Sequence, residues 1–365
     1  MKPKEHFHGS DLEKIEKVYG IRKEDIISFS ANVNPLGVSF RLRDTLTNHI
    51  DAITTYPDRE YTSLRRCIGE YVQTDYENIV VGNGSTELIS LFIQSTHPKK
   101  ALIVGPTYSE YEREVSIGGG RSHYFSLTEA SEFRLDTDAL TEELSHDVDL
   151  LILCNPNNPT SSVIKRGQMR DILDYCKRKS ITVIVDETYV EFAEEPDEVT
   201  AVPLTEFYNN IVILRGISKF FAAPGLRLGY AICGNRDLLK EINQKKNPWT
   251  INSLAAIAGE IMFTDSKYIQ ETRKLISTER TRICARLSEN PNCRSYQPHA
   301  NFVLVKILND KVTSEDVFDH LIRNNLMIRD CSTFPFLNNK YIRFCFMMPE
   351  QNDRLLELLF EALNE

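Results

Sequence analysis

The sequence predicts an α/β protein with a large domain, in which a mostly parallel sheet lies between helices, and a smaller α+β domain formed by both chain ends. Three observations predict this fold class. Apolar, β-branched runs alternate with helical patterns between about residues 78 and 233. After Trp249 the alternation gives way to long helices and then separate strands, and 365 residues exceed what one small core holds. We expect the large domain at residues 46–250, and the small domain with an interdomain helix at 1–45 and 251–365.

The large domain is expected to follow a strand–helix order. Its strands are predicted at residues 78–81, 101–104, 149–154, 181–186, 211–215 and 228–232, with helices at 85–96, 108–117 and 166–179. In such sheets ligands bind outside the carboxyl ends of the strands, so the residues that follow each strand are the candidates for a site.

The small domain is expected to combine helices with separate strands. Helices are predicted at residues 251–263, 268–287, 314–323 and 350–363, and strands at 301–307, 327–329 and 341–346. The N-terminal residues, up to about 45, are expected to pack with this module.

Composition excludes several classes of protein. A net charge of −9, with no basic run interleaved with aromatic residues, argues against nucleic acid as a partner. The first six residues are polar, unlike a signal peptide, and the longest apolar runs are too short to span a membrane. The eight cysteines form no C-x-x-C pair, so we expect neither a metal site nor disulfides. Reduced cysteines are typical of the cytoplasm, where we expect this protein to lie.

The first motif with chemical meaning is Gly82-Asn83-Gly84-Ser85-Thr86, between a predicted strand and helix. Glycine lets the backbone approach an anion closely, and the start of a helix offers N–H donors to it. The motif therefore fits a phosphate-binding loop. Ser85 also fits a simple helix cap, with Glu87 nearby, and both interpretations stay open.

The second and third motifs follow the next buried strands. In Cys154-Asn155-Pro156-Asn157-Asn158-Pro159-Thr160, two X-Pro steps make a rigid turn that could simply be a turn, or could hold an asparagine against a ligand oxygen. Asp186 ends an apolar strand, where a carboxylate is costly unless it is paired. Its partner could be structural, or it could be a cationic ring nitrogen.

The fourth motif is Ser218-Lys219, with Arg227 eight residues further on. A lysine just past a buried strand, beside an arginine, suits a Schiff base next to a phosphate, because desolvation and nearby cations free its amine for attack. A solvated loop lysine is the ordinary alternative, and the neighbouring motifs make it the weaker one.

The order of these four motifs, with Pro224-Gly225-Leu226-Arg227-Leu228-Gly229-Tyr230 after the last, resembles the fold-type I aminotransferase superfamily over nearly the whole chain. Within it, residues 8–10, 29–37, 248–256 and 328–332 are similar to the L-threonine-O-3-phosphate decarboxylases of the cobalamin pathway. The histidinol-phosphate aminotransferases are the next family. Ser10, Ser161 and Gly216 depart from the usual pattern: Ser161 stands where a glycine is usual, and Gly216 where a hydroxyl residue often helps to hold the cofactor phosphate. Residues 344–348 are more apolar than the corresponding segment of the family.

The resemblance implies pyridoxal 5′-phosphate as cofactor and assigns each candidate residue a role. Lys219 would form the Schiff base, Asp186 would pair with the ring nitrogen, Asn158 and Tyr189 would hold the phenolic oxygen, and Tyr108 would stack on the ring. The cofactor phosphate would be held by Gly84, Ser85, Thr86, Ser218 and Arg227, and by Tyr56 from the partner subunit of a homodimer. Arg343 and Arg329 would bind the substrate carboxylate, with Asn158 also facing the substrate, and His8 and Asn32 would lie around the substrate phosphate.

We therefore expect a pyridoxal-phosphate-dependent decarboxylase of a small phosphorylated amino acid, either O-phosphothreonine or O-phosphoserine. Its product would be aminopropanol phosphate for cobamide assembly, or ethanolamine phosphate. The alternative is an aminotransferase of the histidinol-phosphate type. A binding or regulatory protein on the same fold is less compatible with the sequence, because Lys219 is present and no DNA-binding module is visible.

Overall fold

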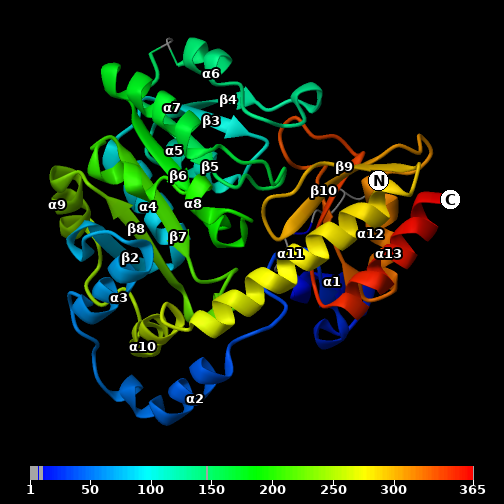
Figure 1. Ribbon diagram of the computed structural model, residues 1–365, viewed down its shortest axis with the longest axis horizontal. Helices are drawn as coiled ribbons and strands as arrows, with labels where there is room; N and C mark the ends of the chain where they lie inside the picture. Colours follow the sequence, from blue (N-terminus) through cyan, green and yellow to red (C-terminus); the bar gives the residue numbers. More distant parts are fainter. Residues whose placement is uncertain (1–6, 8–10, 145–146, 365) are drawn as a thin grey trace.

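The computed structural model describes residue 7 and residues 11–144 and 147–364. Figure 1 shows two β-sheets lying next to each other, with the long helix α11 (Ser266–Ser288) running from one toward the other. The larger sheet, on the left of the view, carries the candidate site. The smaller sheet and the C-terminal helices lie on the right.

The larger sheet is mostly parallel, as the sequence predicts. Within the described residues its strands follow the order β2 (Ile79–Asn83), β8 (Leu228–Cys233), β7 (Ile211–Gly216), β6 (Thr182–Asp186), β5 (Leu150–Cys154), β3 (Lys100–Gly105) and β4 (Arg121–Ser126). Only β8 runs antiparallel to its neighbours, so the carboxyl ends of the other six strands share one edge of the sheet. The sequence analysis missed β4, an edge strand whose polar, half-exposed residues lack the apolar run expected of a buried strand.

Helices cover both faces of this sheet, because alternate strand residues point to opposite sides. One face packs on α4 (Gly84–Thr96), α5 (Glu110–Ile117) and α9 (Arg236–Lys245), and this core includes Val80, Ile103 and Ile152. The other face packs on α3 (Thr62–Val72), α6 (Thr137–Glu143), α7 (Arg166–Arg178) and α10 (Ser253–Met262). Of these helices, α3, α6 and α9 were not expected from the sequence.

The smaller sheet is antiparallel, in the order β12 (Arg329–Asp330), β13 (Tyr341–Cys345), β10 (Phe302–Ile307) and β9 (Cys293–Ser295). It is flanked by α12 (Ser314–Arg323) and α13 (Pro349–Asn364). The single strand expected at residues 327–329 is wrong: β11 (Leu326–Met327) pairs with β1 (Ile27–Ser28), and β12 joins the small sheet. Ile328 separates two short strands that belong to different sheets.

N-terminal residues lie beside C-terminal ones through the β1–β11 pair, and the Phe7 and Phe318 rings stack with centroids 5.6 Å apart. The helices α1 (Leu12–Tyr19) and α2 (Phe40–Asn48) complete this part of the chain. The domain boundaries after residues 45 and 250 stay predictions.

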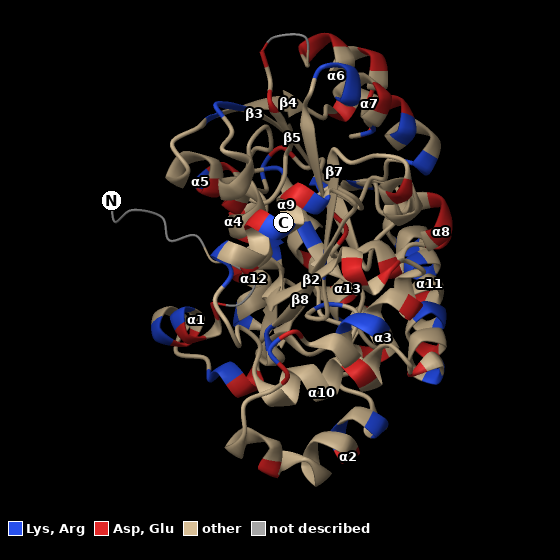
Figure 2. Ribbon diagram, turned by 90° about the vertical axis from the view of Figure 1, so that its left-hand side faces the viewer, with Lys and Arg blue, Asp and Glu red and all other residues tan. Residues whose placement is uncertain are grey.

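Charged residues of both signs lie mainly on the outer helices, such as α7 and α11, whereas the strands of the larger sheet are almost uncharged (Figure 2). Across the described ranges, no helix combines the length and apolar character needed to cross a membrane. No group of three or more His, Cys, Asp or Glu side chains in the same ranges is arranged to bind a metal ion.

Candidate active site

The sequence-predicted motifs meet at one edge of the larger sheet. Gly84, Tyr108, Asn158, Tyr189 and Lys219 follow the carboxyl ends of β2, β3, β5, β6 and β7, and Arg227 precedes the antiparallel strand β8 at the same edge. Topology alone therefore gathers residues that are up to 143 positions apart, from 84 to 227, into one site.

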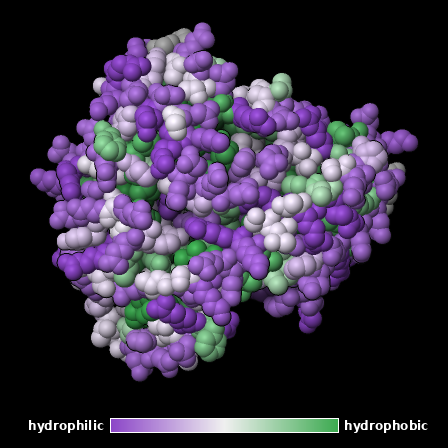
Figure 3. All heavy atoms as spheres, in the orientation of Figure 1, coloured by the Kyte–Doolittle hydropathy of each residue, from purple (hydrophilic) through white to green (hydrophobic). Residues whose placement is uncertain are grey.

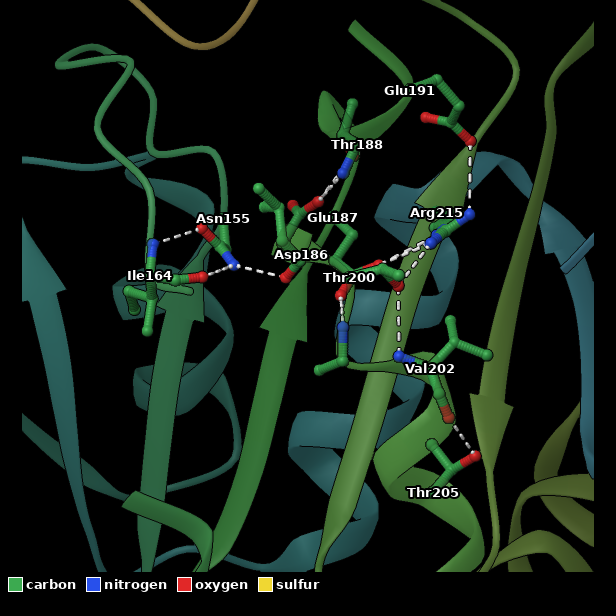
Figure 4. A network of polar contacts seen from close by, with 12 residues as sticks. Asn155, Ile164, Asp186, Glu187, Thr188, Glu191, Thr200, Val202, Thr205 and Arg215 are labelled. Carbon is green, nitrogen blue, oxygen red and sulfur yellow. Dashed lines mark hydrogen bonds and ion pairs between the residues drawn. The ribbon is translucent and has the colours of Figure 1, made fainter. Parts of the chain in front are cut away.

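Asp186, the last residue of β6, is a buried carboxylate held by two neighbouring hydroxyl groups. The Tyr111 hydroxyl donates to Oδ2 at 2.7 Å, and Thr188 donates to Oδ1 from its backbone N–H at 2.9 Å and from its hydroxyl at 2.5 Å. Figure 4 shows Thr188 turned toward Asp186. Three donors suit an ionised carboxylate, so Asp186 is prepared to pair with a cation.

Sequence reasoning missed Tyr111 and Thr188. Thr188 lies two residues after Asp186, a spacing at which a side-chain oxygen commonly accepts a hydrogen bond from the backbone, so this signal was available. Tyr111 lies one helical turn beyond Tyr108, and their rings meet edge to face with centroids 5.7 Å apart. Nothing in the spacing of Tyr111 from Asp186 could have shown their contact.

The Lys219 amine donates to the Ala31 carbonyl oxygen at 2.6 Å, and the charges of Arg343 and Arg227 act on it. Burial, with the Arg343 guanidinium and more weakly that of Arg227, lowers the pKa of Lys219 to about 8. The neutral, nucleophilic form of the amine is therefore far more populated near neutral pH than in an ordinary lysine.

The start of α4 forms the anion-binding part of the site. Gly84 has φ of +79°, and a Cβ there would fall 2.4 Å from Arg227 Nη2, so only glycine lets the arginine lie this close. Helix α4 begins at Gly84 and its N-cap position is Asn83, so Ser85 lies within the first turn. The Asn83 N–H donates to a side-chain oxygen of Glu87 at 2.6 Å. The interpretation of Ser85 as a simple helix cap is wrong.

The remaining phosphate candidates surround this helix start. Tyr108 is half-buried, and burial raises the pKa of its hydroxyl, with Glu110 and Asp186 adding to the effect. Ser218 is half-buried next to Lys219. Gly216 would place an added Cβ 3.6 Å from the Ser85 hydroxyl oxygen, so a small side chain fits there without a clash.

Asn158, Tyr189 and Asn32 form the side of the site nearest the smaller sheet. Asn32, 1% exposed, donates from its amide to the Tyr189 hydroxyl oxygen at 3.3 Å, and Tyr189 is itself only 6% exposed. The Asn158 side-chain oxygen accepts from Arg343 Nη1. The oxygen Oδ1 of Asn32 is buried without a partner in the described part of the protein, so a polar ligand could satisfy it.

Arg343 and Arg329 bring buried positive charge to the site. Arg343 donates to Asn158 and, at 2.7 Å, to the Ser30 carbonyl; Arg329 donates to the Phe7 carbonyl and, at 2.9 Å, to the Thr333 hydroxyl. All four acceptors are neutral. Among the described residues no carboxylate forms an ion pair with Arg343.

Among the described residues, Tyr56 makes no hydrogen bond or ring contact with this cluster. Tyr56 is 80% exposed, and its ring lies 4.9 Å from that of Trp249. His8 lies outside the described residues.

A second polar network lies beside Asp186, to its right in Figure 4. Arg215, near the end of β7, donates to Glu187 at 2.8 Å and to the Thr200 hydroxyl at 2.7 Å, and lies 3.6 Å from Glu191. Glu187 also accepts from the Ala201 N–H at 2.6 Å. These buried charges tie the loops after β6 and β7 together, and so fix the two loops that carry Tyr189 and Lys219.

The donors and acceptors at this edge fit pyridoxal 5′-phosphate. An amine of lowered pKa suits its aldehyde, a buried carboxylate held by hydroxyl donors suits its ring nitrogen, and Asn158 and Tyr189 can donate to its phenolic oxygen. A glycine with positive φ, a helix start and an arginine in contact with that glycine suit its phosphate.

Comparison with known proteins gives the same family as the motifs. The class I and II aminotransferase family matches residues 24–359. The threonine-phosphate decarboxylase of Salmonella typhimurium is 34% identical over 98% of this chain and 96% of its own length. The histidinol-phosphate aminotransferase of Ruminiclostridium cellulolyticum is 31% identical over 92% of each chain. The solved structure of the histidinol-phosphate aminotransferase from Clostridium acetobutylicum superimposes with a TM-score of 0.86 at 32% identity, covering 92% of this chain and 98% of that one.

Proposed function

The chain belongs to the class I and II aminotransferase family, with pyridoxal 5′-phosphate as its cofactor, and from this premise we propose that it decarboxylates a small phosphorylated amino acid. The substrate would be O-phosphothreonine or O-phosphoserine, and the products carbon dioxide and the phosphorylated amino alcohol. A threonine-phosphate decarboxylase that matches nearly end to end supports this proposal.

The observation that carries the proposal is the pair of buried arginines at the site. Arg343 is 4% and Arg329 8% exposed, and the contacts described above pair them with neutral oxygens. Among the described residues Arg343 forms no ion pair with a carboxylate. The charges of Asp330 and Asp11 only partly offset the lowering of the Arg329 pKa by burial. Such buried cations favour an anionic ligand. A phosphorylated amino acid brings a carboxylate and a phosphate to the site on one molecule, whereas an aminotransferase of the histidinol-phosphate type would meet the phosphate on histidinol phosphate and the carboxylate on its oxo acid.

The residues that would hold the cofactor follow from the fit described above. Lys219 would hold its aldehyde carbon, Asp186 its ring nitrogen, and Asn158 and Tyr189 its phenolic oxygen, with Tyr108 against the ring. Gly84, Ser85, Thr86, Ser218 and Arg227 would hold its phosphate. Tyr111 and Thr188 would act through Asp186, by holding that carboxylate in a fixed orientation.

When bound, the cofactor supplies an electron sink for the pair of electrons released at the α carbon of the substrate. The bond that breaks is the one held perpendicular to the ring, so orientation decides between losing carbon dioxide and losing a proton. Arg343 and Arg329 would set that orientation through the carboxylate, and His8 and Asn32 through the phosphate. The Lys219 amine would then return a proton to the α carbon.

We also propose that the enzyme is a homodimer in which Tyr56 reaches the partner's cofactor phosphate. Large apolar side chains are exposed on α2 and the turn after it, with Phe40 84%, Ile53 64% and Tyr56 80% exposed. Figure 3 shows a largely hydrophilic face with some hydrophobic atoms at the lower end of the molecule, where α2 lies. Such apolar exposure is typical of an interface. Light scattering in solution tests the assembly, and a monomer at micromolar concentration would contradict it.

The function is tested by incubating the cofactor-loaded protein with O-phosphothreonine and O-phosphoserine separately, with and without 2-oxoglutarate. Carbon dioxide and a phosphorylated amine, formed at the same rate without the oxo acid, are the expected result. One methyl group separates the two substrates, so we expect their kcat/KM values to differ by about 10–200-fold.

The second candidate function is an aminotransferase of the histidinol-phosphate type, favoured by the 32% identity and full-length superposition with one such structure. It requires an oxo acid as acceptor. Glutamate formed from 2-oxoglutarate with histidinol phosphate as donor, without release of carbon dioxide from either phosphoamino acid, would replace the decarboxylase proposal.

A further inference from the structure

Ser161, at the end of the turn that carries Asn158, occupies a backbone conformation unusual for serine. Its φ is +60°, in the left-handed region, and its side chain is completely buried. The sequence singled out this position because related proteins usually have glycine there. A strained backbone persists only where the surrounding contacts compensate for it.

The compensation is a contact with a distant segment. The Ser161 hydroxyl oxygen accepts hydrogen bonds from the N–H groups of His299 at 3.0 Å and Ala300 at 2.8 Å, and the Ser161 carbonyl also accepts from His299 at 3.0 Å. A glycine has no hydroxyl and could not make the first two bonds. Ser161 therefore joins the turn after β5 to the residues that lead into β10.

The anchored segment leads directly to the site. Asn301, the next residue and fully buried, donates from its amide to the Asn32 carbonyl at 3.0 Å. Asn32 has φ of +55°, and its amide donates to the Tyr189 hydroxyl oxygen at 3.3 Å. An uninterrupted path, made of hydrogen bonds and adjacent residues, thus runs from Ser161 to Tyr189.

The end of this path determines which way Tyr189 donates. Burial raises the pKa of the Tyr189 hydroxyl, so the group keeps its hydrogen at neutral pH. Because the Tyr189 oxygen already accepts from Asn32, its own hydrogen is free to be donated to another acceptor. In the fit described above, that acceptor is the phenolic oxygen of the cofactor.

We propose that Ser161 is a positioning residue that, through the segment 299–301 and Asn32, fixes the direction in which Tyr189 donates to the cofactor. The proposal rests on the cofactor, and it holds whichever substrate the enzyme takes. A hydrogen bond donated to the phenolic oxygen stabilises its ionised form, so losing that bond raises the pH at which the bound chromophore loses its proton.

The test uses two glycine substitutions, Ser161→Gly and Asn32→Gly, and their combination. Both positions have positive φ, so glycine removes the side chain without adding backbone strain. Arg280 still donates to the Ala300 carbonyl at 3.1 Å, which leaves the segment one support in Ser161→Gly. Ser162→Ala is the matched control, because it removes a hydroxyl one residue along that bonds to Thr160 rather than to residues 299–301.

The measurement is the pH midpoint of the visible absorption of the bound cofactor, with thermal unfolding of the cofactor-free protein alongside. We expect the midpoint to rise by about half a pH unit or more in Ser161→Gly and in Asn32→Gly, and to stay unchanged in Ser162→Ala. In the double variant the rise should be smaller than the sum of the two single rises, because both substitutions act on the same path. An unchanged midpoint in folded, cofactor-loaded Ser161→Gly would overturn the proposal, even if stability falls. If Ser161→Gly does not fold, an unchanged midpoint in Asn301→Ala would overturn it in the same way.

Discussion

Arg329 and Arg343 face each other as register partners on β12 and β13, and both side chains are buried. Burial, together with the nearby Arg343 charge, lowers the pKa of Arg329. Two buried cations side by side repel each other, so this part of the protein is prepared for an anion that relieves the repulsion.

Removing one of these charges should weaken substrate use without removing the cofactor. We expect Arg343→Gln to lower kcat/KM for O-phosphothreonine by about 10- to 150-fold, which is the loss expected when one hydrogen bond to a charged group is removed. Arg286→Gln on α11 is the control, because that arginine is 42% exposed and its ion pair is with Glu289, on the surface. Steady-state kinetics measure the effect. An unchanged kcat/KM in Arg343→Gln would remove Arg343 from the substrate site.

The Lys219 amine should control how fast the cofactor-free protein takes up pyridoxal phosphate. Because the pKa of Lys219 is lowered to about 8, the neutral and reactive amine increases as pH rises through 8. We therefore expect the uptake rate, followed by visible absorption after mixing, to rise between pH 7 and 9 and then level off. In Arg343→Gln a nearby cation is lost, the pKa of Lys219 rises, and the midpoint should move to higher pH. A midpoint near 10.5, the value of an unperturbed lysine, in the unaltered protein would contradict this assignment.

Tyr111 should matter for cofactor binding although it makes no contact with the substrate in the proposed mechanism. Tyr111→Phe removes the 2.7 Å hydrogen bond to Asp186 and keeps the ring. A hydrogen bond to a charged group contributes about 1.5–3 kcal/mol, so we expect cofactor affinity to fall by about 10-fold or more. Tyr124→Phe is the matched control, since its hydroxyl also donates to a carboxylate, Glu112 at 3.0 Å, but away from the site. Equal losses of affinity in both variants would show that Tyr111 has no special role.

The sequence predicted much of this site because strand ends are visible in it. Asp186, Asn158 and Lys219 each follow a buried apolar run, and parallel topology brings such positions to one edge. The order of the motifs then gave the family. What sequence reasoning could not give were the contacts between distant residues, such as Tyr111 with Asp186 and Ser161 with Ala300, because no local pattern encodes them.

The missed elements have a related cause. The edge strand β4 and the helix α9 carry many polar residues, so each is only partly buried and neither contains the continuous apolar run that marks a buried strand. The split at Ile328 could not be read from the sequence, because the two short strands are separated by a single residue and no local pattern shows that each joins a different sheet. Local patterns report how much of an element is buried, and they do not report which sheet it joins.

Removing only one partner of the buried Glu187–Arg215 pair should lower the free energy of unfolding strongly. Burial alone would lower the pKa of Arg215, but Glu187, and less strongly Glu191, raise it, so the arginine stays charged. Arg215→Met would leave Glu187, fully buried, without its cation, and we expect a loss of about 3–5 kcal/mol in the free energy of unfolding. The double variant Arg215→Met/Glu187→Gln should recover part of this loss, because the glutamine can still accept from the Ala201 N–H.

Arg22→Met is the control, because the ion pair of Arg22 with Asp25 is exposed. We expect this substitution to lower the free energy of unfolding by less than about 1 kcal/mol. Urea unfolding of the cofactor-free protein measures all three, and similar losses for Arg215→Met and Arg22→Met would show that burial does not make this pair important.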